Sequence, residues 1–108
     1  MKSKFFPLIT AVLAMGLFFT SVCQAHTPLC SCYDNGDGSI TCEGGFSDGS
    51  SASGVDMRVE DKGGNVLLKG KMSEDSEYTF DKPSAAYTVV FDAGEGHRVV
   101  VDGREITE

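Results

Sequence analysis

The chain has 108 residues, of which 41% are hydrophobic, and a formal net charge of -7. This length corresponds to one small domain and excludes a multidomain enzyme. The excess of acidic residues argues against nucleic acid and anionic lipid as partners, and it favours cations electrostatically.

Residues 1–25 have the pattern of a secretory signal peptide. Lys2 and Lys4 give a positive start, residues 8–19 are nearly all apolar, and small residues end the segment at Ala25. The apolar run is shorter than the roughly 20 residues that a membrane-spanning helix needs. We therefore expect cleavage after Ala25, a periplasmic or secreted location, and no transmembrane segment in the processed chain.

Cleavage at this point changes both the charge and the chemistry of the chain. Cleavage removes two of the nine basic residues and none of the sixteen acidic ones, so the formal net charge of residues 26–108 is -9. His26 then carries a free α-amino group and an imidazole, which together can chelate a metal ion. Pro28 has no backbone N–H, which excludes a square-planar chelate built on successive deprotonated amides.

Three cysteines remain after cleavage, Cys30, Cys32 and Cys42, an odd number in a compartment that favours disulfides. Cys30 and Cys32 share one face if their segment is extended, and either can reach Cys42 across a turn over residues 34–39. Three interpretations stay open: a structural disulfide with one thiol left over, a soft-metal site in which thiolates join His26, and a redox pair. The two tight cysteine pairs that are typical of zinc sites are missing from the sequence.

The pattern from residue 55 onward predicts short β-strands separated by turns. We expect strands over residues 55–60, 66–72, 78–80, 87–91 and 98–101, with a last short strand around Ile106. The first two form a hairpin across residues 61–65. Six to seven strands at this spacing predict an all-β fold, a small immunoglobulin-like or prealbumin-like β-sandwich.

The expected organisation has three parts. A cleaved signal peptide (1–25) is followed by a Cys/Gly/Ser-rich N-terminal segment (26–54) and by the β-sandwich domain (55–108). Within the second part, the Gly/Ser-rich residues 44–54 are expected to form a flexible lead into the sandwich. The inward-facing side chains that should build the core are Val55, Met57, Val59, Val66, Leu68, Tyr78, Phe80, Val89, Phe91, and Val99 or Val100.

The second histidine of the chain, His97, lies in the phrase Asp92-Ala93-Gly94-Glu95-Gly96-His97-Arg98. The glycines predict a tight turn between two strands, with the imidazole presented at its end. From the residues alone, His97 is either a surface histidine without a role or a metal ligand.

Residues 66–80 and 87–98 resemble the β-sandwich domains found as extra periplasmic components of nickel and cobalt uptake transporters. These domains are similar to carboxypeptidase-regulatory-like and copper-resistance CopC-like sandwiches. The resemblance implies a three-nitrogen site made by the amine and imidazole of His26 and the imidazole of His97, suited to Ni(II) or, second, Cu(II). It further implies Asp92 or Glu95 as an added oxygen ligand or as a partner that orients His97.

The function expected on this basis is a periplasmic metal-binding protein rather than an enzyme, which delivers Ni(II) to a membrane uptake system. One alternative is a copper-binding CopC-like protein or a metal site built from the cysteines. Another is a carboxypeptidase-regulatory-like structural or interaction module without metal. The sequence contains no phosphate-binding loop of the GxxxxGK[ST] type.

Overall fold

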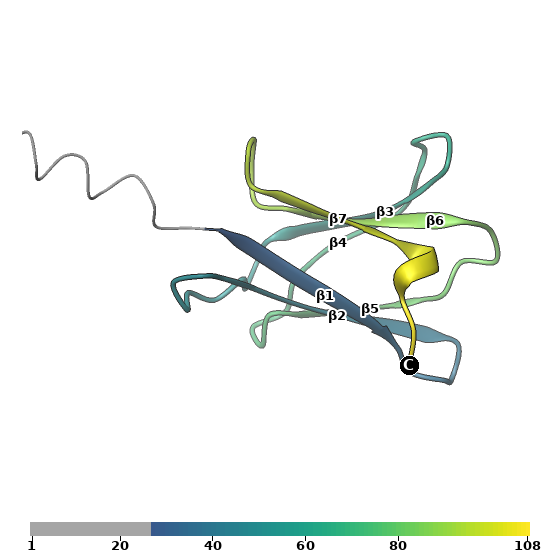
Figure 1. Cartoon of the computed structure of the whole chain (residues 1–108), viewed down its shortest axis with the longest axis horizontal. Coiled ribbons are helices and arrows are strands. Elements are labelled where there is room, and N and C mark those ends of the chain that lie inside the picture. The colour runs from purple at the N-terminus through teal and green to yellow at the C-terminus, as the bar shows by residue number, and fades with distance from the viewer. Residues whose placement is uncertain (1–26) are drawn as a thin grey trace, which may run out of the picture.

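Seven antiparallel strands in two facing sheets make up the protein, whose computed structural model describes residues 27–108 (Figure 1). The strands are β1 (Pro28–Asp34), β2 (Ser39–Phe46), β3 (Asp56–Asp61), β4 (Val66–Lys71), β5 (Glu77–Asp81), β6 (Tyr87–Asp92) and β7 (Arg98–Asp102). One sheet has the strand order β1-β2-β5, and the other has the order β4-β3-β6-β7. The small all-β sandwich expected from the sequence is confirmed.

The predicted hairpin of β3 and β4 is confirmed, with its turn over residues 61–65. Asp61 holds this turn, because its Oδ1 accepts the backbone N–H groups of Gly63 and Asn65, both at 2.9 Å. A β-bulge between Val59 and Glu60 interrupts the register of the pair. The Asp61 carboxylate thus satisfies backbone donors of the turn locally.

The core lies between the two sheets and contains most of the side chains predicted for it. Met57, Val59, Phe80, Val89 and Phe91 are buried as expected, and Ile40 and Cys42 of β2 join them. Tyr78, Val55 and Val99 pack against this cluster. Val100, the alternative to Val99, is 65% exposed.

Two residues predicted for the core, Val66 and Leu68, are exposed, by 51% and 37%. Leu68 lies opposite the buried Val59, so it is on the inner face of the sheet. For Leu68 the expectation fails because β4 is the edge strand of a four-stranded sheet that faces only three strands. For Val66 it fails because the β-bulge places this residue opposite Glu60, away from the buried face. An alternating pattern identifies an inner face but does not show whether another sheet covers it.

The expected boundary between an N-terminal segment (26–54) and the sandwich (55–108) is corrected by the structure. β1 and β2 supply two of the three strands of one sheet, and residues 44–46 belong to β2 instead of a flexible lead. Gly44 is required inside this strand, because a Cβ there would lie 2.6 Å from Cε2 of Phe91 and 3.0 Å from Cε of Met72. The expected signal peptide (1–25) lies outside the described residues.

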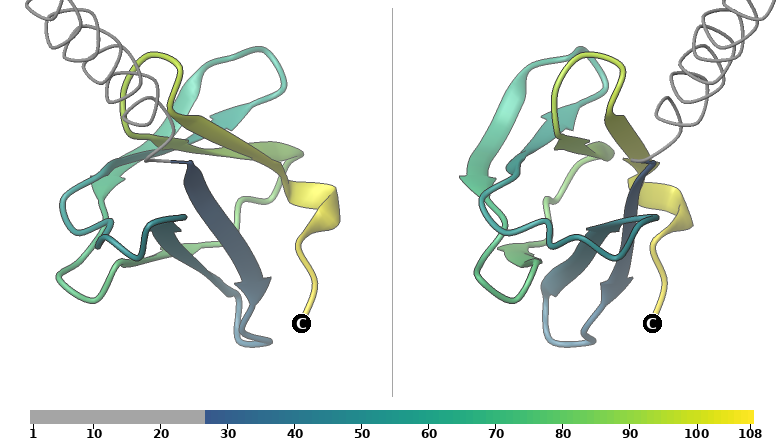
Figure 2. Two further views of the ribbon diagram at one scale, coloured as in Figure 1. Left: turned by 60° about the vertical axis from the view of Figure 1, so that its left-hand side comes forward. Right: turned by 90° about the vertical axis from the view of Figure 1, so that its left-hand side faces the viewer.

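β1 and β7 border each other on one side of the sandwich, as Figure 2 shows. At the end of β1 the backbone N–H of Asp34 donates to the carbonyl of Thr107, which follows β7, at 2.9 Å. The two strands therefore run in the same direction and begin at the same end of the sandwich (Figure 1).

The short strand expected around Ile106 is replaced by the 3-10 helix η2 (Gly103–Glu105). Ile106 follows this helix and is buried. None of the helices within residues 27–108 has the length and hydropathy that crossing a bilayer requires.

Candidate metal centres

The turn between β6 and β7 presents His97 to solvent, in agreement with the predicted tight turn. Its backbone is closed by two hydrogen bonds, from Ala93 N–H to the His97 carbonyl at 3.0 Å and from His97 N–H to the Gly94 carbonyl at 2.9 Å. Gly94 and Gly96 have φ values of 115° and 78°, which side chains other than glycine rarely adopt. The two glycines of the phrase are thus explained by the turn itself.

The imidazole of His97 is oriented by its own turn. Nδ1 lies 3.2 Å from the backbone carbonyl of Glu95. A carbonyl oxygen can only accept, so Nδ1 carries the proton in this contact, and the lone pair of the neutral ring is on Nε2. This is the arrangement in which a histidine offers Nε2 to a metal ion.

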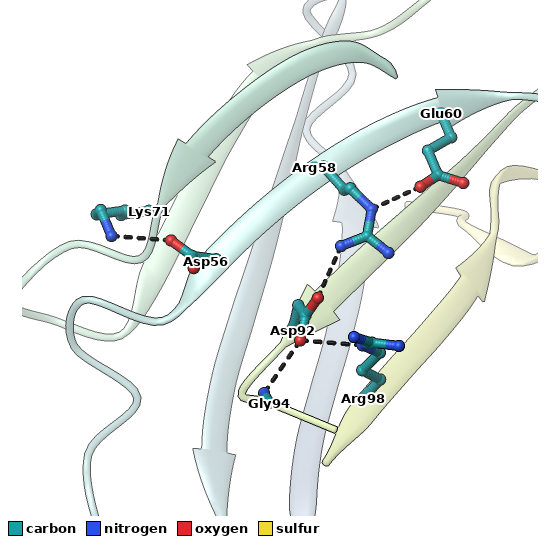
Figure 3. A network of polar contacts seen from close by, with 7 residues as sticks. All are labelled: Asp56, Arg58, Glu60, Lys71, Asp92, Gly94 and Arg98. Atoms are coloured by element: carbon teal, nitrogen blue, oxygen red, sulfur yellow. Dashed lines mark hydrogen bonds and ion pairs between the residues drawn. The ribbon is translucent and has the colours of Figure 1, made fainter. Parts of the chain in front are cut away.

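Asp92 is held by three donors around its carboxylate (Figure 3). Oδ2 accepts from Nη1 of Arg58 at 2.8 Å, whereas Oδ1 accepts from the backbone N–H of Gly94 at 3.0 Å and pairs with Nε of Arg98 at 3.1 Å. These contacts, that of Arg58 first, lower the pKa of Asp92 to about 2. The carboxylate therefore anchors both sides of the turn, and its oxygens are already engaged.

The described chain begins at the same end of the sandwich as the His97 turn, since β1 and β7 start there together (Figure 1). Thr27 is fixed to the loop after β2 by two hydrogen bonds. Its N–H donates to Oγ of Ser47 at 3.0 Å, and its carbonyl accepts from the Ser47 N–H at 2.9 Å. His26, the other predicted ligand, lies outside the described residues.

The three cysteines come together on the paired strands β1 and β2. Cys32 lies directly opposite Cys42 and forms a disulfide with it, whereas Cys30 lies opposite Gly44 and is a free thiol. Of the alternatives open from the sequence, the structure has the disulfide from Cys32, and Cys30 is the thiol left over.

All three sulfur atoms nevertheless lie within 4.8 Å of one another. Cys42 is fully buried and Cys30 is half-buried beside the core. Burial raises the pKa of the Cys30 thiol to about 11. The described residues thus contain a compact sulfur cluster with one thiol that stays protonated at neutral pH.

Comparisons of the chain with protein-family models, with curated proteins and with solved structures find no match. The resemblance to periplasmic components of nickel and cobalt uptake transporters therefore stays a prediction from residues 66–80 and 87–98. Any functional conclusion has to come from the two centres themselves.

Arg58, the main partner of Asp92, is not evident as a site residue from the sequence. Arg58 alternates with the buried Met57 and Val59, and this pattern does place its side chain on the outer face of β3. Its position relative to Asp92 follows only from the register of β3 with β6, where Asp56 lies opposite Asp92. No signal within the sequence fixes that register.

Proposed function

We propose that the processed protein binds one divalent transition-metal ion at the end of the sandwich and delivers it to a membrane uptake system outside the cytoplasm. The ligands are the new amino terminus, the imidazole of His26 and Nε2 of His97. Nickel(II) is the preferred ion and copper(II) the second, because nitrogen ligands suit both in tetragonal geometry.

The observation that carries this proposal is the common position of the two ligand-bearing segments. Thr27, the residue that follows His26, is hydrogen-bonded in place at the end of the sandwich where the His97 turn projects. The segment that follows His26 and the turn that carries His97 begin at one end of the fold, which supports a shared site over a module without metal.

The chemistry of the turn supports the same proposal. The contact from Nδ1 of His97 to the Glu95 carbonyl leaves Nε2 available for a metal ion. Asp92 acts by holding the turn through Gly94 and Arg98 rather than by binding the ion. The acidic surface of the processed chain raises the local concentration of cations.

The test is a metal titration of the exported protein, after mass spectrometry has established that it begins at His26. Ni(II) and Cu(II) are each titrated by calorimetry into the parent, into His97→Ala, and into a form with one extra glycine before His26. We expect both changes to weaken binding by on the order of 10–100-fold or more, since each removes or displaces a direct ligand. Glu105→Gln, an exposed carboxylate at the opposite end, is the matched control and should bind as the parent does.

The outcomes separate the alternatives. Equal binding by the parent and both changed forms would refute the three-nitrogen site. Preference for Cu(II) with the same variant pattern would keep the site and reassign the protein to copper. Absence of binding in all forms would favour a structural or interaction module of the carboxypeptidase-regulatory type.

A further inference from the structure

The cluster of Cys30, Cys32 and Cys42 has a chemistry that the His97 site does not use. We propose that it is a redox-gated site for one copper(I) ion, blocked while Cys32 and Cys42 form their disulfide and able to bind once that disulfide is reduced. This site lies on the ribbon of β1 and β2 and is independent of the metal centre proposed above.

The spacing of the sulfur atoms fits a three-coordinate ion. Metal–sulfur bonds of about 2.3 Å place three trigonal ligands about 4 Å apart. The three Sγ atoms already lie within 4.8 Å of one another on two paired strands. Opening the disulfide lets Cys32 and Cys42 separate by side-chain rotation, while the backbone pairing keeps Cys30 beside them.

The number and type of ligands select the ion. Thiolates are soft ligands that favour Cu(I) and Zn(II). Structural zinc sites take four ligands, whereas the group found within residues 27–108 contains three and no histidine or carboxylate. Three thiolates in a mainly apolar setting therefore favour Cu(I) over Zn(II).

The cluster is shielded but can be reached from outside. Cys42 is fully buried, and both Cys30 and Cys32 pack against the core. Cys30 itself is only half-buried, which leaves a route from solvent to its thiol. An ion or a small reductant can enter there, and the apolar surroundings protect the loaded site from solvent.

Reduction of the disulfide between Cys32 and Cys42, which opens the site, takes two electrons and two protons from a dithiol. The dithiol gives up two electrons and two protons and becomes a disulfide, while the bond between Cys32 and Cys42 breaks and each becomes a thiol. Binding of Cu(I) then replaces the three S–H protons by three Cu–S bonds and releases those protons.

The experiment compares oxidised and reduced protein in a competition for Cu(I) against a chromophoric chelator. We expect the protein reduced with a dithiol and freed of reductant without air to take up one Cu(I) per chain, and the oxidised protein to take up none at this site. Cys30→Ser keeps the disulfide and thus the oxidised fold. After reduction, Cys30→Ser should bind Cu(I) more than about 100-fold more weakly than the reduced parent, because it has lost a direct ligand. Loss of a group that only contacts a ligand costs roughly 10–100-fold.

Two further measurements test whether Cu(I) binds the folded protein at this cluster. If reduction unfolds the protein, Cu(I) must restore its β-sheet circular dichroism, because an ion that binds only the folded form stabilises it. His97→Ala must leave Cu(I) uptake unchanged, which separates this site from the one under Proposed function. Equal uptake by the oxidised and reduced forms, equal uptake by reduced parent and Cys30→Ser, or uptake without refolding would each overturn the proposal.

Discussion

Arg58 of β3 and Asp92 of β6 form an ion pair across two neighbouring strands, with Nη1 2.8 Å from Oδ2. Arg58 also donates to Glu60, and Asp92 also holds Arg98 and the backbone of Gly94 (Figure 3). The pair therefore couples the outer face of the four-stranded sheet to the turn that carries His97.

We predict that protonation of Asp92 makes the protein less stable in acid. Its pKa of about 2 in the folded state lies below the ordinary 3.8, so the ionised carboxylate stabilises the fold above about pH 4, and this stabilisation is lost as the pH falls toward 2. Melting temperatures measured across this range should fall. Asp92→Asn should show a smaller fall, while Asp102, whose pKa is also lowered, still contributes. A carboxyl titration midpoint near 3.8 by NMR would contradict the prediction.

Removal of the disulfide should cost substantial stability. The bond between Cys32 and Cys42 joins residues separated by 10 positions, and closing a loop of that size contributes about 3 kcal/mol in the chain-entropy model. For Cys32→Ala combined with Cys42→Ala we expect a melting temperature lower by roughly 10–20 °C. The matched control is Cys30→Ala, which removes the free thiol and should cost less than about 1 kcal/mol. Similar losses in the two variants would show that packing, not the cross-link, is what matters.

Gly44 and Gly45 offer an adjacent pair for testing how tightly the sheets pack. A Cβ at Gly44 would lie 2.6 Å from Cε2 of the fully buried Phe91, whereas the nearest atom to a Cβ at Gly45 is the carbonyl oxygen of Ser50 at 3.9 Å. Gly44→Ala should therefore destabilise the protein by about 1–3 kcal/mol through overpacking. Gly45→Ala should change the free energy of unfolding little. Chemical denaturation measures both, and equal effects would mean that Phe91 can move.

Alkylation should find Cys30 slow to react in the folded protein. Its pKa of about 11, against the ordinary 9.0, leaves roughly 100-fold less thiolate at neutral pH. We expect iodoacetamide to modify one thiol per chain, more slowly by at least this factor than in denatured protein with the disulfide intact. Mass spectrometry over a pH series gives the rates. A folded rate equal to the denatured rate at pH 7 would show that the thiol is not protected.

Sequence patterns were informative where alternation was strong. The strands around Met57, Val59, Val89 and Phe91 were predicted because apolar side chains recur at every second position. β1 and β2 were missed as part of the sandwich because cysteine, serine and glycine occupy many of their positions. In β2 a glycine, Gly44, takes an inner position that Phe91 fills from the other sheet.

The candidate sites show the same contrast between features that depend on local sequence and features that depend on strand pairing. The sequence identified His97 at a glycine-bounded turn and three cysteines with two possible disulfides, because these depend on local spacing. It left open which cysteine pairs with Cys42, since Cys30 and Cys32 share a face and only the register of β1 with β2 chooses between them.

By itself, the sequence determined the all-β class, the β3–β4 hairpin and the tight turn before β7. Local alternation and turn residues carry that information along a single segment. Only the tertiary structure decided that Arg58 reaches Asp92, that β4 is an edge strand, and that β1 begins at the same end as the turn before β7. These relationships depend on the register and packing of strands far apart in the chain, and each is fixed by the fit of whole sheets rather than by neighbouring residues.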